Sequence, residues 1–408
     1  MKRFLVRALS VVATLLMLGV FVFVWRQPGT GCDWQLRMNE ARCVLSGTDP
    51  YAVWHGDVVQ SPFCPLDSPS VSVSGDVRPL HVYPPWEYAL VLPFSFVSDN
   101  VAWRMKQIAQ FLAVFLVAVL VDLEARRRGF VRADAELTAS VTLLISSYLV
   151  FTNAGVGNFA VEILLAYLIL SVALRKGCDV LAGCCWAFAM IKPHLALPIA
   201  IPLLLYRKYK VCFVAAALCL SASLAPAFLS HTNPLDLIIE TFRAGVGYFY
   251  GAGTIPYCCC GILPATVNVI LGLLIGSAVC LWLTIRFKRC VGDDWFYVLM
   301  PVAVCSMTWT YALSHAHLMG LILIACIVME LVADPRSRFL WIVFVLSLPI
   351  LSRVFLAGHG FCAFFGYPFP MSEYAFRVVD SLNSTASLAL AVAFTLWKTR
   401  KGACDVAV

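Results

Sequence analysis

The chain has 408 residues, of which 61% are hydrophobic and 13% are charged, and its mean hydropathy is +0.85. A soluble domain averages about 45–50% apolar and about 25% charged residues, so this chain lacks the polar surface that two or three soluble globules would need. We therefore interpret residues 1–408 as a single integral membrane domain of the all-α class. This excludes cytosolic nucleotide-sugar enzymes and disordered scaffolds. The net charge of +7 does not indicate nucleic acid, because Lys and Arg collect in short clusters between apolar runs and so report membrane orientation.

The apolar runs predict a polytopic protein with about 12 transmembrane helices. The first run, residues 8–25, follows Lys2, Arg3 and Arg7, and no small-residue cleavage pattern comes before Arg26, so we expect a retained helix with a cytoplasmic N-terminus. The other predicted spans are 101–122, 137–152, 159–174, 180–191, 195–206, 211–229, 263–285, 297–313, 318–331, 339–357 and 385–397. The runs 180–191 and 195–206 are shorter than the usual length, so they must extend into flanking residues or cross incompletely.

Simple alternation of these spans places every basic cluster on the cytoplasmic side, as the positive-inside rule requires. Residues 84–98 contain three prolines and are too short for an easy crossing, so we predict a re-entrant or interfacial helix there. Residues 26–83 then form a first extracytoplasmic loop, and residues 230–261 form a second large one. We expect a multi-pass protein of the cell (plasma) membrane whose polar chemistry gathers at the extracytoplasmic face.

Four local patterns occur in order along the chain. Asp33 and the turn Gly47-Thr48-Asp49-Pro50-Tyr51 lie in the first outer loop, Tyr83-Pro84-Pro85 follows, Lys192-Pro193-His194 comes next, and Trp309 precedes His315 and His317. In this order they resemble the pattern of glycosyltransferase family 87, the polyprenol-phosphate-mannose-dependent α-mannosyltransferases of the GT-C superfamily. The chain departs from that pattern at His194, where the family commonly has Gln, and in carrying two late histidines.

The resemblance implies a GT-C-like fold and a membrane glycosyltransferase. The expected reaction transfers a sugar, mannose by the resemblance, from a polyprenyl-phosphate donor to a glycolipid or glycan acceptor at the extracytoplasmic face. Membrane lipids are the other expected partners, and nucleic acid is not one. Two alternatives stay open: a carrier or flippase for a lipid-linked or anionic solute, and a polymerase or ligase of lipid-linked glycans.

Such a transfer needs a base for the acceptor hydroxyl and a cation for the departing phosphate. Asp33 follows the first predicted helix closely enough to fold over the mouth of a cleft, and with the resemblance we assign it as the catalytic base. The alternative is a solvated or capping carboxylate. Lys192 lies between apolar segments, where an ionisable group is a functional candidate by default, so we predict a phosphate contact; a snorkelling anchor is the alternative.

The other candidates are substrate-binding residues. Asp49 precedes a proline and either shapes its turn or touches substrate, with the turn favoured. Tyr51 is as suited to packing as to binding, and Tyr83 and His194 are candidates through their motifs.

His315 and His317 raise the question of a metal. Two side chains at i and i+2 on a helix point about 200° apart, so we expect one histidine, His317 for preference, to face the cleft. We predict no metal ligands and no certain cofactor, because the spacing does not support a divalent ion.

Overall fold

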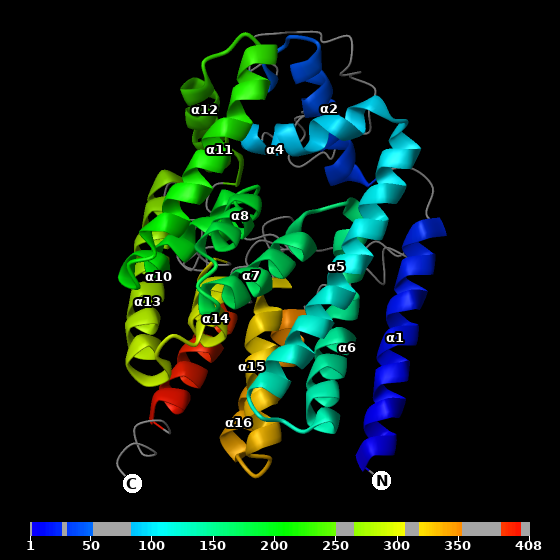
Figure 1. Cartoon of the computed structure of the whole chain (residues 1–408), viewed down its shortest axis with the longest axis vertical. Coiled ribbons are helices and arrows are strands. Elements are labelled where there is room, and N and C mark those ends of the chain that lie inside the picture. The colour runs from blue at the N-terminus through cyan, green and yellow to red at the C-terminus, as the bar shows by residue number, and fades with distance from the viewer. Residues whose placement is uncertain are drawn as a thin grey trace.

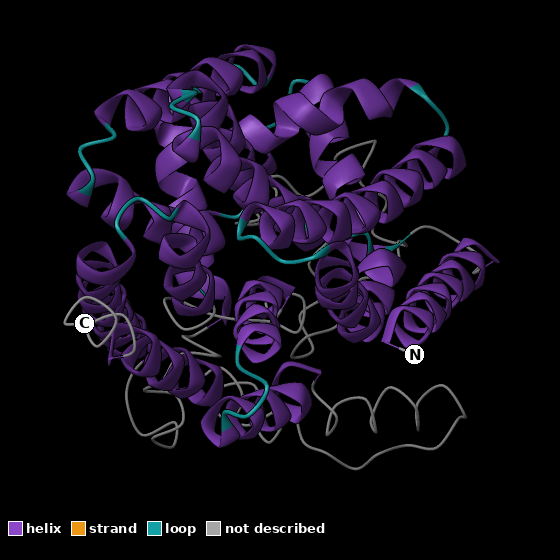
Figure 2. Cartoon of the chain, turned by 60° about the horizontal axis from the view of Figure 1, so that its bottom comes forward, coloured by secondary structure: helices purple, strands orange, loops and turns teal. Residues whose placement is uncertain are grey.

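The computed structural model describes residues 2–26, 31–51, 83–249, 265–306, 318–352 and 385–400. These residues form helices joined by short turns, and the described part contains no strand (Figure 2). The prediction of an all-α protein is therefore confirmed for the described ranges.

The helices follow one another along the chain as shown in Figure 1. Their bounds are α1 Lys2–Arg26, α2 Cys32–Leu45, α4 Pro85–Val91, η1 Leu92–Phe96, α5 Asp99–Arg127, α6 Arg132–Val156, α7 Ala160–Arg175, α8 Asp179–Ala189, α9 Pro193–Ala196, η2 Leu197–Ile199, α10 Ala200–Leu205, α11 Tyr209–Leu229, α12 Pro234–Phe249, α13 Ala265–Val291, α14 Trp295–Cys305, α15 Leu321–Ala333 and α16 Arg338–Ser352. A further helix covers residues 385–400.

Within the described ranges, four helices are long and apolar enough to cross a membrane: Arg3–Arg26, Asp99–Arg127, Tyr209–Leu229 and Ile270–Arg289. The two parts of α6 would add a fifth span if that bent helix crosses as one. Several other predicted spans are shorter apolar helices. The run 195–206, for example, is divided among α9, η2 and α10, because Pro198 and Pro202 each remove a helical hydrogen bond.

The apolar side chains are distributed as expected for helices in a lipid environment. Every residue of α14 is buried, as are residues 321–331 of α15, and these two helices belong to the main hydrophobic core. In contrast, α1, α5, α11 and α13 leave large apolar side chains uncovered, among them Phe4, Leu112, Phe213 and Leu274. Exposed apolar surface of this extent marks an interaction surface, so these apolar helices indicate a membrane protein.

An ion network joins the helices at the end of the molecule where α1 begins (Figure 1). Buried Glu124 of α5 accepts hydrogen bonds from Arg127 and, across from α7, from Arg175 at 2.7 Å. Arg128 binds Asp294, which precedes α14, at 2.7 Å. The basic clusters that follow α5 and α7 therefore share one end of the bundle, which is the arrangement that the alternating topology requires.

Short helices cover the opposite end, at the top of Figure 1. Two of them lie inside segments that the sequence indicated only as outer loops: α2 within residues 26–83 and α12 within residues 230–261. The segment 84–98 forms α4 and η1, neither of which is long enough to span a bilayer.

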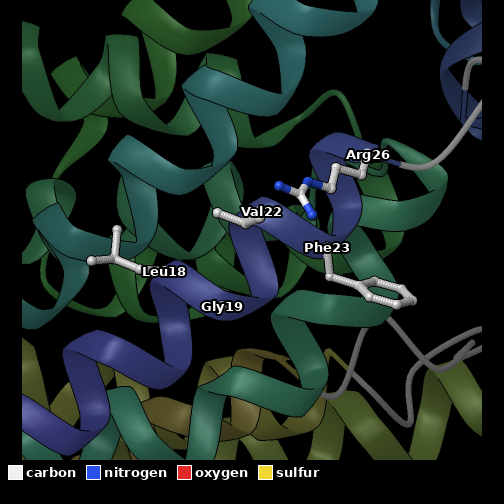
Figure 3. A pocket seen from close by; sticks show the side chains of 5 residues that line it. All are labelled: Leu18, Gly19, Val22, Phe23 and Arg26. Atoms are coloured by element: carbon white, nitrogen blue, oxygen red, sulfur yellow. The ribbon is translucent and has the colours of Figure 1, made fainter.

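A surface hollow lies on α1, lined by Leu18, Gly19, Val22, Phe23 and Arg26 (Figure 3). Leu18 and Val22 project from the same side of the helix, and Arg26 ends it. The lining is almost wholly apolar and the helix is a candidate span, so this hollow suits hydrocarbon and offers no group for acid–base chemistry.

Candidate functional site

Asp33 lies in the first turn of α2 and is partly buried. Its Oδ2 accepts a hydrogen bond of 2.6 Å from Nδ2 of Asn158, the residue two places before α7. The other atom of that amide, Oδ1, accepts the backbone N–H of Ala160 at 3.1 Å. Since Oδ1 is committed to an N–H donor, the NH₂ group of Asn158 must face Asp33. One carboxylate oxygen of Asp33 is thus fixed in direction.

Two glycines allow the chain to bring Asn158 so close to α2. Gly157 has φ +79°, and a Cβ there would lie 2.7 Å from side-chain atoms of both Trp34 and Trp103. A Cβ on Gly31 would lie 2.6 Å from the backbone of Val156. At Gly157, only glycine combines the left-handed conformation with this close approach. At Gly31, whose φ is −60°, the close approach alone requires glycine, so the contact between Asp33 and Asn158 depends on both positions.

Lys192 is buried in the turn between α8 and α9, with only 2% of its surface exposed. Pro193 disfavours a helical conformation at Lys192, which has φ −118° and ψ 88°, and itself occupies the first position of α9. The turn is tied to α4, because Nε1 of Trp86 donates a hydrogen bond of 2.9 Å to the carbonyl of Met190. Among the described residues, no hydrogen bond or ion pair engages the Lys192 ammonium; it lies 5.6 Å from the centre of the Tyr83 ring.

The charge of Lys192 depends on its surroundings. Burial lowers the pKa of Lys192 to about 7, because the ammonium loses its hydration. Among the neighbouring charges, Asp33 has the largest effect and raises the pKa of Lys192. Glu87 also raises this pKa, whereas Arg37 and Lys106 lower it. Lys192 and Asp33 therefore belong to one electrostatic cluster, although they are far apart in the sequence.

Arg37 and Glu87 form the buried centre of this cluster. Arg37, one turn after Asp33 on α2, lies 3.2 Å from Glu40 and 3.8 Å from Glu87, and its guanidinium is 3.5 Å from the centre of the Tyr83 ring. Glu87 in the first turn of α4 is fully buried, and within the described part of the chain neither carboxylate oxygen has a hydrogen-bond partner. Burial raises the pKa of Glu87 to about 8, against the effect of Arg37.

Lys106 and Glu162 border the cluster on the side of α5 and α7. The Lys106 ammonium lies 2.5 Å from Glu162 Oε1 and 3.4 Å from the centre of the Phe159 ring. This ion pair is partly shielded from water, with the lysine side chain 3% exposed. Lys106 is thus neutralised by a local partner, which leaves Lys192 as the better placed cation for an incoming anion.

Asp49 and Tyr51 support the site from its edge. Asp49 Oδ1 accepts the Tyr51 N–H at 2.8 Å and so caps the helical segment whose first residues are Pro50 and Tyr51. The buried Tyr51 hydroxyl donates to the Tyr83 carbonyl at 2.8 Å and also hydrogen-bonds Thr241 at 2.5 Å. These contacts hold Tyr83, whose ring faces Arg37. In the structure, Asp49 thus stabilises its own turn, and Tyr51 holds the backbone of Tyr83 in place.

The remaining predicted residues are placed as follows. His194 is buried in α9, two residues after Lys192, and burial lowers its pKa. His315 and His317 lie outside the described residues. Within the described ranges, no group of three or more His, Cys, Asp and Glu side chains is arranged to hold a metal ion.

Sequence reasoning missed Arg37 and Asn158, and it left Glu87 unassigned. Arg37 was hidden because residues 26–83 were interpreted as a loop, so the spacing of Asp33 and Arg37 on one helix face was not considered. A signal was available for Lys106, since a lysine inside a long apolar helix is a functional candidate by default. Asn158 gave no such signal beyond following a glycine.

One known protein family is similar to part of the chain. Residues 81–243 match the model of glycosyltransferase family 87. This match supports the assignment to glycosyltransferase family 87, and with it a transferase activity. The matched segment is less than half of the chain; it includes Tyr83, Glu87, Asn158 and Lys192, whereas Asp33 precedes it. No curated protein and no solved structure matches the chain.

Proposed function

We propose that this glycosyltransferase transfers a sugar, mannose as first candidate, from a polyprenyl-phosphate donor to a glycolipid or glycan acceptor. Asp33 acts as the general base, Lys192 binds the donor phosphate, and the reaction takes place at the extracytoplasmic face of the plasma membrane. The observation that carries the proposal is the placement of a fixed carboxylate, Asp33, and a buried cation without an ion-pair partner among the described residues, Lys192, in one cluster.

The expected step needs these two groups in different roles. A carboxylate oxygen of Asp33 takes the proton of the acceptor hydroxyl while the hydroxyl oxygen forms a bond to the anomeric carbon of the sugar. The bond between that carbon and the phosphate oxygen breaks, and its electron pair leaves with the polyprenyl phosphate. The departing phosphate gains negative charge, which a nearby ammonium stabilises.

Asn158 is a positioning residue in this scheme. Its NH₂ group occupies one oxygen of Asp33, so the remaining lone pairs are available to the acceptor. Tyr83 offers an aromatic ring whose centre lies 3.5 Å from the Arg37 guanidinium and 5.6 Å from the Lys192 ammonium. Tyr51 and Thr241 keep the backbone of Tyr83 in place through their hydrogen bonds.

The proposal is tested by the transfer of labelled mannose from polyprenyl-phosphate mannose to lipid in membranes that contain the protein, with donor binding measured separately. Lys192→Gln should weaken donor binding and slow transfer, and Lys192→Arg should keep part of both because a cation remains. Lys176→Gln removes an exposed lysine at the end of α7 and should leave both unchanged. Wild-type transport of the lipid-linked sugar without transfer from any polyprenyl-phosphate sugar would favour the carrier instead.

A further inference from the structure

Helix α12 has an exposed apolar stripe. Leu235, Ile239 and Phe242 are 60%, 47% and 46% exposed, and their spacing of four and three residues places them on one side of the helix. Leu237 and Thr241 lie on another side and are buried against the rest of the chain.

The charged residues of α12 occupy a separate side. At about 100° per residue, Asp236, Glu240 and Arg243 lie about 80–140° around the helix from Leu235. Arg243 and Glu240 form an ion pair of 2.5 Å, with the arginine side chain 69% exposed. The helix therefore has three sides: one packed on the protein, one apolar and uncovered, and one charged.

The position of α12 in the chain indicates what covers the apolar stripe. The helix begins five residues after the end of α11, a candidate membrane span that leaves Leu224 and Phe228 exposed. Figure 1 shows α12 beside the upper part of α11. The stripe thus continues apolar surface at the end of a span, which is the depth where hydrocarbon gives way to water.

The shape of the stripe argues against a protein partner. Three side chains in single file, bordered by charges, fall well short of the roughly 1,000 Å² that a stable protein interface buries. A narrow apolar side next to a charged side is instead typical of helices that lie in the membrane interface.

We propose that α12 is an interfacial helix, with Leu235, Ile239 and Phe242 inserted into the bilayer leaflet at the candidate site's end of the bundle. Asp236, Glu240 and Arg243 then face the aqueous side. The packed side connects this lipid contact to the candidate site, because Thr241 hydrogen-bonds Tyr51, and Tyr51 hydrogen-bonds the Tyr83 carbonyl. The depth of α12 in the leaflet therefore sets the position of the Tyr51 and Tyr83 side of the site.

Photocrosslinking in phospholipid vesicles tests the proposal. The full-length protein carries p-benzoylphenylalanine at one position at a time, and lipid adducts are measured on the modified peptide by mass spectrometry. The matched pair is Phe242 and Arg243, neighbouring exposed residues on different sides of α12. Phe228, which is 80% exposed on α11, serves as the positive control for lipid contact.

The expected result is an adduct yield at Phe242 close to that at Phe228 and at least about fivefold above that at Arg243. Equal yields at Phe242 and Arg243 would overturn the proposal. So would crosslinks from Phe242 to a second protein chain in place of lipid. Only variants whose melting temperature in detergent equals that of the wild type are compared, and Ile239 with Asp236 provides a second pair should either first variant be unstable.

Discussion

Burial shifts the pKa values of Lys192 and Glu87 in opposite directions. Loss of hydration lowers the pKa of the Lys192 ammonium to about 7 and raises the pKa of the Glu87 carboxyl to about 8, because each neutral form is favoured in a site of low polarity. Near neutral pH both groups are therefore close to a change of charge. A bound phosphate would favour the charged form of Lys192, so donor binding and protonation are coupled.

This coupling predicts a pH dependence of donor binding. Binding needs the protonated lysine, so affinity for the polyprenyl-phosphate donor should fall about fivefold between pH 7 and pH 8, as expected for a group with a pKa of about 7 in the free site. Lys192→Arg keeps its charge throughout this range and should change by less than about twofold. Donor titrations at several pH values measure the affinity of the wild type and of Lys192→Arg. A flat wild-type profile, or an equal slope in Lys192→Arg, would contradict the role of Lys192.

Among the elements, the turn between α6 and α7 places Asn158, whose side chain donates the hydrogen bond that fixes the Asp33 carboxylate. Gly157→Ala introduces a Cβ at a positive φ and within 2.7 Å of Trp34 and Trp103, so it should destabilise the protein by about 1–3 kcal/mol beyond the backbone strain alone. Gly129→Ala is the matched control, since Gly129 has φ +83° and no neighbouring atom within 4 Å. Thermal unfolding in detergent compares the two. Equal losses of stability would show that packing at Gly157 contributes little.

The same turn explains why part of the site was invisible in the sequence. Asp33, Tyr83 and Lys192 were predicted from short motifs: Tyr83 and Lys192 each precede a proline, and Asp33 follows the first predicted span by eight residues. Asn158 becomes relevant only when Gly31 and Gly157 let two distant segments meet, which no local pattern reports. Helix α2 escaped detection because buried residues such as Arg37, Asn39 and Glu40 interrupt the apolar periodicity that marks an ordinary amphipathic helix.

At the scale of the whole molecule, composition was sufficient to predict a helical membrane protein, and the long spans α1, α5, α11 and α13 coincide with predicted apolar runs. The total of about 12 spans is not confirmed. Proline-broken segments such as residues 193–205 are short, and length alone does not decide whether they cross. Their number depends on how the pieces pack together.

The topology makes a separate prediction. Arg132, at the start of α6, and His231, after α11, are both exposed, and the alternating arrangement places them on opposite sides of the membrane. With an impermeant maleimide on intact cells, His231→Cys should be labelled, and Arg132→Cys should be labelled only after permeabilisation. Mass spectrometry of the modified peptides separates these sites from native cysteines. Labelling of Arg132→Cys from outside would contradict this topology.

The most direct test of the account is sugar transfer by Asp33→Asn. This substitution keeps the shape of the side chain but removes its basicity, so turnover at saturating polyprenyl-phosphate donor should fall by about 10² or more, while the melting temperature stays near the wild-type value. Because Asp33 also supports the charge of Lys192, the donor affinity of Asp33→Asn is measured at a pH well below about 7, where Lys192 stays protonated and the affinity should be close to that of the wild type. Lys192→Gln, in contrast, should weaken donor binding at every pH as well as slow transfer. Transfer by Asp33→Asn at close to the wild-type rate would contradict the assignment of Asp33 as the base.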